Sequence, residues 1–265
     1  MIIIEETKVA IKAARMAGDY LLKQFKKSQR IDKKGKHDFV TQADREAEKI
    51  IISYLKKKYP EYSMLAEESG NIKAGPNTSA SQNYYKWVID PLDGTANYML
   101  GIPFFDTAIG LVLKDKLLVS VIYAPITNEL FVAELYRGAQ LNGKSIQVST
   151  MQQIEGSIMC FCHNNNTKEI TRNIKIYQKL KQYPAIFNQP RAGNLELAYL
   201  ADGRIDAFVN NGAKTWDSVC GSLLVREACG KVTDFSGKEW TITSRDLLAS
   251  NGLLHQKLLK LVKGV

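Results

Sequence analysis

Two carboxylates with a spacing suited to metal binding stand at Asp90 and Asp93, within the segment DPLDGT (residues 90–95). Proline fixes its own φ and glycine tolerates backbone conformations closed to other residues, so the segment should form a tight turn after the preceding apolar run. Such a turn can aim both carboxylates and the carbonyl of Leu92 into one space. Hard cations such as Mg²⁺ prefer an all-oxygen environment of this kind. The segment therefore predicts a magnesium site.

The amides that follow these carboxylates could bind an anion. If Gly94 and Thr95 open a helix or a backbone nest, their N–H groups would be available to a phosphate. Two further acids stand in short motifs elsewhere, Glu67 in AEESG and Asp217 in WDSVCG. Taken alone, adjacent glutamates are usually surface charges, and an aspartate that opens a helix is usually only a cap. Their chemistry depends on whether the fold brings them together.

The rest of the sequence predicts helices and antiparallel strands that must position these acids. Apolar residues at helical spacing predict a helix over residues 5–25, and Thr41 with Asp44 has the spacing of a capping box at the start of a second helix. We expect Asp217 to be the N-cap of a later helix. The mixture indicates a layered α+β or α/β arrangement. The further expected elements are strands over 87–91, 107–113, 117–123, 129–135 and 206–209, helices over 166–180, 195–200 and 218–229, and an exposed loop over 71–83.

Composition narrows the class of protein. The chain has 265 residues and a net charge of +9, with its lysines spread along the sequence. No nucleic-acid-binding signature is present, so the excess charge indicates a solvated surface with a weak attraction for an anionic substrate. The start lacks the features of a signal peptide and no apolar run is long enough to span a bilayer, so we expect a cytoplasmic protein with no membrane or nucleic-acid partner. The four cysteines do not complete a zinc pattern and are expected to be reduced.

Four motifs that occur in one order give the sequence a resemblance to a known family. They are Thr41 with Asp44, the EES motif at Glu67, the long signature WVIDPLDGTANY (residues 87–98) and the WD pair at Asp217. Together they resemble the inositol monophosphatase family, within the wider group of lithium-sensitive, metal-dependent sugar phosphatases. The resemblance covers most of the chain.

The resemblance implies the fold. Members of the family have a layered αβαβα sandwich of the inositol monophosphatase and fructose-1,6-bisphosphatase type, and they are usually homodimers. We expect residues 1–146 to form a half with a helix pair and an antiparallel sheet, carrying most metal ligands. We expect residues 147–265 to form an α/β half that carries Asp217 and the specificity residues.

The resemblance also implies the metal ligands. Glu67, Asp90 and the carbonyl of Leu92 match residues that hold a first magnesium in the family. Asp90, Asp93 and Asp217 match those that hold a second, and a third, weaker ion would share Glu67. Asp93 and Asp217 would border the substrate as well, and Mn²⁺ could replace Mg²⁺. Two cations beside a phosphate monoester would neutralise its charge, lower the pKa of a water and stabilise the departing alkoxide.

Catalytic roles follow from the same resemblance. Thr95 matches a threonine that helps to orient the attacking water, and Asp44 matches an aspartate that hydrogen-bonds this threonine. Glu67 would assist the deprotonation of the water. Gly94 and Thr95 would donate their backbone amides to the phosphate.

Substrate specificity is where the sequence departs from the family pattern. The family commonly has Gly-Ser-Ala-Ala before Leu-Glu-Leu, where this chain has RAGN (residues 191–194). Arg191 could bind a second phosphate, or it could be a displaced surface side chain. Asn210 stands where many members have a glutamate that contacts inositol hydroxyls, and an amide both donates and accepts hydrogen bonds. The expected substrate contacts in this half are Arg191, Gly193, Asn194 and Asn210.

These matches imply a Mg²⁺-dependent hydrolase of a small phosphorylated metabolite, with myo-inositol phosphate as the first candidate. The departures leave the 2′-phosphate of NADP, fructose 1,6-bisphosphate and 3′-phosphoadenosine compounds as alternatives. A catalytically silent regulatory protein on the same fold is the alternative outside catalysis. The polar run from His163 to Asn166 lies either near the site or in a surface loop.

Overall fold

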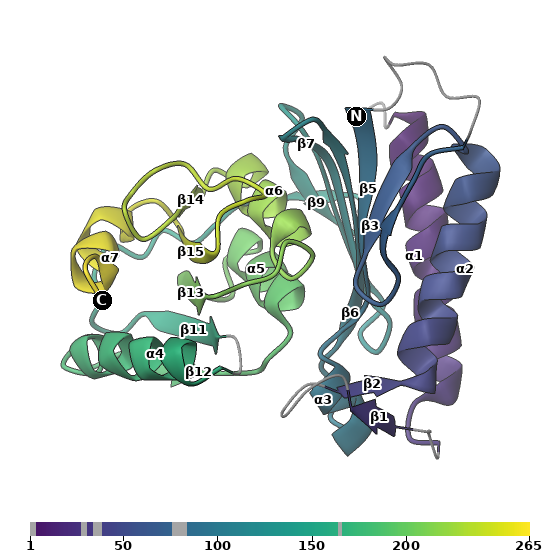
Figure 1. Ribbon diagram of the computed structural model, residues 1–265. Coiled ribbons are helices and arrows are strands. Elements are labelled where there is room, and N and C mark those ends of the chain that lie inside the picture. Colours follow the sequence, from purple (N-terminus) through teal and green to yellow (C-terminus); the bar gives the residue numbers. More distant parts are fainter. Residues whose placement is uncertain (1–3, 28–30, 34–38, 76–83, 164–165) are drawn as a thin grey trace.

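The computed structural model describes residues 4–27, 31–33, 39–75, 84–163 and 166–265. Helices and sheets alternate in layers: a helix pair, an eight-stranded sheet, a second helix pair, a five-stranded sheet and an outer helix pair (Figure 1). Apolar cores fill the spaces between successive layers. The architecture confirms the αβαβα sandwich that the sequence led us to expect.

One edge of the eight-stranded sheet brings together two of the segments that contain the predicted metal ligands. Its strands lie in the order β10-β9-β8-β7-β6-β5-β3-β4, and β3 and β5 are parallel neighbours. Because parallel strands end at the same edge of a sheet, the residues that follow β3 come to lie beside the end of β5. The bounds are β3 (Ser63–Ala66), β4 (Gly70–Ile72), β5 (Tyr85–Asp93), β6 (Asp106–Leu113), β7 (Lys116–Ala124), β8 (Glu129–Glu134), β9 (Ala139–Leu141) and β10 (Lys144–Ile146).

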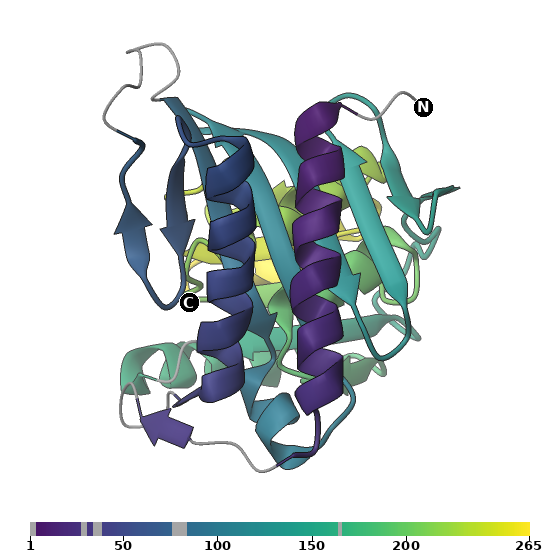
Figure 2. The same cartoon turned by 90° about the vertical axis from the view of Figure 1, so that its right-hand side faces the viewer.

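Helices α1 (Glu5–Gln24) and α2 (Gln42–Lys58) lie side by side across the outer face of this sheet (Figure 2). α1 buries small side chains, including Ala10, Ala13 and Ala17, which let it approach the sheet and α2 closely. Both helices were predicted from sequence, and both are confirmed.

The start of α2 is fixed by the predicted capping box. The Thr41 hydroxyl accepts a hydrogen bond from the Asp44 N–H, and the Asp44 carboxylate accepts one from the Thr41 N–H at 2.8 Å. Strands β1 (Ile31–Lys33) and β2 (Phe39–Thr41) pair antiparallel and lead the chain into this cap. The capping box therefore holds Asp44 in one orientation in the first turn of α2.

The second half of the chain builds the remaining layers. α5 (Gly193–Ala201) and α6 (Val219–Glu227) lie between the two sheets, and α4 (Thr167–Leu180) and α7 (His255–Val262) cover the outer face of the five-stranded sheet (Figure 1). That sheet has the order β12-β11-β13-β15-β14. Its strands are β11 (Ile158–His163), β12 (Ile186–Asn188), β13 (Ala207–Asn211), β14 (Lys231–Thr233) and β15 (Asp246–Ser250).

Two details of the predicted elements are wrong. β5 runs through Asp93 instead of ending at Pro91, and its ladder with β6 shifts register between Asp90 and Asp93. The expected tight turn is thus a bulge within a strand. The N-cap of α6 is Ser218 and not Asp217, because the Asp217 carboxylate turns back to accept the Lys214 N–H at 3.0 Å. Strands β11 and β15 were not predicted, since a short buried run carries no alternation of polar and apolar residues.

The proposed boundary at residues 146 and 147 falls between the end of β10 and the start of β11. α5 and α6 pack against both sheets through one shared core, so we keep the division into two halves as a proposal. The loop expected over 71–83 begins too early, because residues 71 and 72 belong to strand β4, and residues 76–83 lie outside the described part of the chain. Among the described residues, no helix combines the length and apolar character needed to cross a membrane.

Candidate active site

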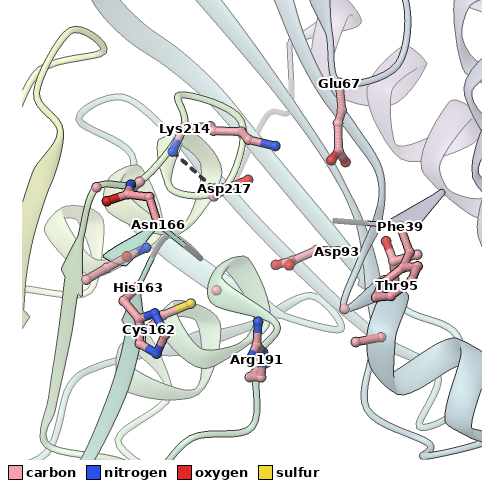
Figure 3. A pocket seen from close by; sticks show the side chains of 16 residues that line it. Phe39, Glu67, Asp93, Thr95, Cys162, His163, Asn166, Arg191, Lys214 and Asp217 are labelled. Carbon is pink, nitrogen blue, oxygen red and sulfur yellow. Dashed lines mark hydrogen bonds between the residues drawn. The ribbon is translucent and has the colours of Figure 1, made fainter. Parts of the chain in front are cut away.

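A cavity of about 340 Å³ opens between the edge of the eight-stranded sheet and the start of α5. Figure 3 shows three carboxylates entering it from separate segments: Glu67 after β3, Asp93 at the end of β5 and Asp217 before α6. The sequence placed these three acids far apart, and the fold brings them to one cavity. Its further lining residues are Phe39, Gly94, Thr95, Ala96, Cys162, His163, Asn166, Arg191, Gly193, Asn210, Gly212, Ala213 and Lys214.

The bulge in β5 sets the positions of Asp90 and Asp93. Pro91 cannot donate to the ladder, and its carbonyl instead accepts the Thr107 hydroxyl at 2.9 Å. Asp90 is 2 % exposed, and its Oδ1 has no hydrogen-bond partner. Asp90 and Leu92 are buried and are not among the residues that line the cavity. A buried, unpartnered carboxylate oxygen is costly unless a positive charge or a donor reaches it.

Asp93 is held by the first turn of α5. Its Oδ2 accepts the Asn194 N–H at 2.6 Å. Burial and the nearby Asp217 carboxylate nevertheless raise the pKa of Asp93 to about 7. Gly193 is needed at this contact, because a Cβ there would lie 3.0 Å from the Asp217 carbonyl oxygen. The start of α5 therefore fits tightly between two of the predicted metal ligands.

Thr95 links the cavity to the capping box of α2. Its hydroxyl lies 2.9 Å from Asp44 Oδ1 and 3.1 Å from the Leu92 carbonyl oxygen, and it can donate its one proton to either. Asp44 is fully buried, and burial raises the pKa of its carboxyl despite the donors around it. The contact between Thr95 and Asp44 that the resemblance implied is present in the structure.

Glu67 is positioned by a residue that the sequence analysis missed. Its N–H donates to the Ile89 carbonyl at 3.2 Å, which continues the pairing of β3 with β5. The buried Glu48 of α2 accepts the Glu68 N–H at 2.7 Å and the Ser69 hydroxyl at 2.5 Å. These bonds fix the turn that follows Glu67. No signal in the sequence distinguishes Glu48 from the other charged residues of α2.

The carboxylates face one cavity but do not crowd together. Within the described residues, no three Asp, Glu, His or Cys side chains stand close enough to ligate a single ion in this arrangement. Repulsion between ionised carboxylates favours this separation. The pKa of Asp90 reports the same repulsion: burial raises it well above its usual value, and the charges of Glu67 and Asp93 raise it further. Burial and the Asp93 charge do the same for the pKa of Asp106, a fully buried acid that the sequence analysis did not single out.

The wall opposite Glu67 and Thr95 belongs to the C-terminal half, which also contributes Asp217. Arg191, Asn210, His163 and Asn166 all line the cavity, as does Lys214, which the sequence analysis had not singled out. Residues 164 and 165 lie outside the described part of the chain.

Asn194 differs from the expectation. Its side chain is fully buried, donates to the Trp216 carbonyl at 2.9 Å and accepts the Gly221 N–H at 3.3 Å. The structure therefore does not bring the Asn194 side chain to the cavity, because that side chain joins α5 to the segment that leads into α6. What it places at the site is the Asn194 backbone N–H, bonded to Asp93.

Comparison with known proteins places the chain in a family. The sequence profile of the inositol monophosphatase family matches residues 4–265. The chain belongs to the inositol monophosphatase family. The family is one of phosphatases that bind phosphorylated substrates and generally use Mg²⁺.

Some relatives are named as inositol monophosphatases, and others carry the name SuhB. The chain is 37 % identical to the Nus factor SuhB of Escherichia coli strain K12 over 246 residues, which is 92 % of this chain and 90 % of the relative. The extragenic suppressor protein SuhB of Bartonella henselae is 33 % identical, with a TM-score of 0.92, over 99 % of this chain and 100 % of that one. The IMPase of Thermotoga maritima is 31 % identical, with a TM-score of 0.87, over 98 % and 97 % of the two chains.

Gly193→Ala tests the tight fit at the start of α5. The added Cβ would lie 3.0 Å from the Asp217 carbonyl oxygen, so α5 and the Asp217 turn must move apart by a few tenths of an ångström. We expect about a tenfold fall in phosphate release under the best conditions found for the wild type, because small displacements of positioned groups lower the rate. Gly75→Ala is the matched control, since its Cβ would meet the Pro60 carbonyl oxygen at 3.2 Å but Gly75 does not line the cavity. Equal activities of the two variants would contradict the importance of this contact.

Proposed function

We propose that this protein is a Mg²⁺-dependent phosphatase that hydrolyses the phosphate monoester of a small metabolite, with an inositol monophosphate as the first substrate to test. The observation that carries the proposal is the convergence of Glu67, Asp93 and Asp217 on one cavity that also contains Thr95. Membership of a phosphatase family supports the same reaction class.

The chemistry of the donor atoms fits Mg²⁺, although the carboxylates would have to draw together around the ion. The donor set is entirely oxygen, and the buried Oδ1 of Asp90 lacks a hydrogen-bond partner, which is the environment that a hard cation satisfies. When bound, Mg²⁺ supplies positive charge that neutralises the phosphate and lowers the pKa of a water. The proposed ligands are Glu67, Asp90, the Leu92 carbonyl, Asp93 and Asp217.

The hydroxyl of Thr95 is suited to orient the attacking water. Since its proton is directed to Asp44 Oδ1 or to the Leu92 carbonyl, its lone pairs are left to accept a hydrogen bond from that water. Glu67 faces the same cavity and would accept a proton as the water attacks. Asp44 acts through Thr95 and is therefore a positioning residue.

The substrate phosphate would meet backbone donors at the start of α3 (Thr95–Leu100). Gly94 is the N-cap of this short helix, with a φ of 89°, and a Cβ there would lie 3.0 Å from the Phe104 carbonyl oxygen. A glycine thus allows the backbone to take a left-handed conformation and to pass close to Phe104. We propose that the N–H groups of Gly94 and Thr95 donate to phosphate oxygens.

A phosphate-release screen tests this function. The purified protein would be assayed with Mg²⁺ and with Mn²⁺ against inositol 1-phosphate, NADP, fructose 1,6-bisphosphate and 3′-phosphoadenosine compounds. We expect turnover of at least one substrate that requires the divalent ion. Absence of turnover with every substrate and both metals would refute the proposal. Inhibition by Li⁺, a homodimer in sedimentation and a cytoplasmic location are further proposals that rest on the family resemblance.

A regulatory role without catalysis is the second candidate. The observation that favours it is the name Nus factor, which several curated relatives carry and which does not denote a hydrolase. Against it, this chain keeps a carboxylate at each position where the family has a carboxylate metal ligand. The same screen separates the two candidates, because a silent protein would release no phosphate above the level of an Asp93→Asn variant.

A further inference from the structure

Helices α4 and α7, which form the outermost layer of the C-terminal half (Figure 1), expose lysines and no acid. The one acid in the two helices, Glu169, is buried and bonded to Arg172 at 3.1 Å. We call this surface the lysine face; it comprises Lys168, Lys175 and Lys179 of α4, Lys257 and Lys260 of α7, and Lys181 and Lys263 directly after the two helices. Within the described residues, none of these lysines forms an ion pair.

The lysines of α4 lie along one side of the helix. Lys175 and Lys179 stand seven and eleven residues after Lys168, and both separations are close to a whole number of helical turns. Like charges four residues apart, such as those of Lys175 and Lys179, repel each other and weaken the helix. The sequence led us to expect no nucleic-acid partner because the lysines are spread along the chain, but the fold gathers this group on one face.

The opposite outer layer of the molecule does not share this one-signed surface. Helices α1 and α2 also carry many lysines, but acids accompany them: Glu5 pairs with Lys8 at 3.1 Å, and Glu46 pairs with Lys49 at 2.7 Å. Mixed signs of this kind are typical of a helix face that meets only solvent. A face that carries cations alone instead attracts polyanions.

A groove with aromatic walls adjoins the lysine face. It has a volume of about 360 Å³ and lies between α4 and β12, the edge strand of the five-stranded sheet. Tyr177 lines it, is 39 % exposed and stands nearly edge-on to Phe187, with ring centroids 5.6 Å apart. The Lys181 ammonium lies 4.9 Å from the centre of the Phe187 ring, so the lysine face reaches the groove. The groove is also lined by the exposed amides of Asn188 and Gln189.

We propose that the lysine face and the adjoining groove bind single-stranded RNA. The lysines contact successive phosphates, and one base enters the groove and stacks on Tyr177. The amides of Asn188 and Gln189 can both donate to and accept from a base edge or a 2′-hydroxyl. This surface lies outside the proposed metal site, and the inference does not depend on the proposed function.

Two other polyanions fit the surface less well. A nucleic-acid duplex keeps its bases stacked inside, so it would contact the lysines and leave the aromatic groove unused. An anionic membrane would also attract the lysines, but the amides of the groove would lose water among acyl chains without gaining hydrogen bonds. Both are therefore included in the test.

The first measurement is fluorescence anisotropy of a labelled single-stranded RNA of about 12 nucleotides and mixed sequence, titrated with the whole chain. One triple variant, Lys168→Gln with Lys175→Gln and Lys260→Gln, neutralises part of the lysine face. Its control neutralises three exposed lysines at the end of α2 and has the same net charge; it combines Lys56→Gln, Lys57→Gln and Lys58→Gln.

We expect the wild type to bind this RNA with a Kd below about 10 µM near 100 mM KCl, and the lysine-face variant to bind at least ~10-fold more weakly. Each phosphate contact with a single strand adds about 0.7 to the slope of log K against log salt concentration, so the slope should fall by about 2 in this variant. The control variant should keep the affinity and the slope of the wild type.

The second measurement tests the groove. Tyr177→Leu keeps an apolar side chain but removes the ring, and it should weaken RNA binding by at least ~5-fold, with no change in the salt slope, because stacking is not electrostatic. Tyr177→Phe keeps the ring and should bind as the wild type does. A Tyr177→Leu variant that is folded and binds as tightly as the wild type would overturn the role of the groove.

Several results would overturn the inference as a whole. They are no RNA binding by the wild type, equal losses in the two triple variants, equal affinity for a duplex of the same length, and binding to phosphatidylserine-containing vesicles in place of RNA. Phosphate release by the lysine-face variant should equal that of the wild type, because its substituted lysines do not line the active-site cavity. RNA binding can therefore be confirmed or refuted whether or not any phosphate ester is hydrolysed.

Discussion

Asp93→Asn is expected to lower kcat by at least ~100-fold at saturating Mg²⁺, since it removes one negative charge from the proposed metal site. The fold should persist, because the asparagine carbonyl can still accept the Asn194 N–H that now bonds to Asp93 Oδ2 at 2.6 Å. Turnover would be followed by phosphate release over a Mg²⁺ titration, so that weaker metal binding and slower chemistry are separated.

The matched control for this variant is Asp115→Asn. Asp115 lies in the exposed turn between β6 and β7 and does not line the cavity. Its substitution by asparagine makes the same chemical change at an exposed position. It should leave kcat unchanged. If Asp93→Asn is nearly as active as the wild type, Asp93 is not part of the catalytic site and the proposed second metal site is wrong.

Stabilisation by Mg²⁺ is expected to grow with pH. Burial and neighbouring carboxylates raise the pKa of Asp93 to about 7 in the metal-free fold, whereas an aspartate in the unfolded chain titrates near 4. The folded metal-free protein thus binds more protons than the unfolded chain between these values, so its stability falls as pH rises from about 4 to about 7. Mg²⁺ binds the ionised carboxylates and should reverse this loss.

Thermal unfolding with EDTA and with Mg²⁺, at pH 5.5 and pH 8 and at matched ionic strength, measures this effect. We expect Mg²⁺ to raise Tm by at least ~3 °C more at pH 8 than at pH 5.5. Asp93→Asn should reduce the difference, since one of the titrating groups is gone. A Tm increase that is equal at the two pH values would show that the acids of this cavity do not form the Mg²⁺ site.

The features that could be predicted from sequence are those determined by neighbouring residues. The capping box at Thr41 and Asp44 depends on a spacing of three residues, and the structure contains it. The unusual backbone around Asp90 and Asp93 was anticipated from Pro91, although a bulge replaces the expected turn. Glu67 and Asp217 could be joined to this segment only through the family resemblance, because nothing local indicates that β3 and the turn before α6 reach the same cavity.

The features that could not be predicted depend on contacts between residues that lie far apart in the sequence. Glu48 supports the turn after Glu67 only because α2 packs beside the end of β3. Asn194 was expected at the substrate because its position matches a family motif, but its side chain instead bonds to backbone groups of Trp216 and Gly221. Lys214 carries no motif, and its place in the cavity follows from the Asp217 turn.

The hydrogen bond from the Asn194 N–H to Asp93 joins residues made at very different times during synthesis. When the strand that bears Asp93 leaves the ribosome, neither the start of α5 nor Asp217 yet exists. A truncated product that contains the complete first sheet would therefore hold Asp93 without its Asn194 partner and without Asp217. Activity should appear in one step, only after the last proposed ligand has been added and the layers have closed around it.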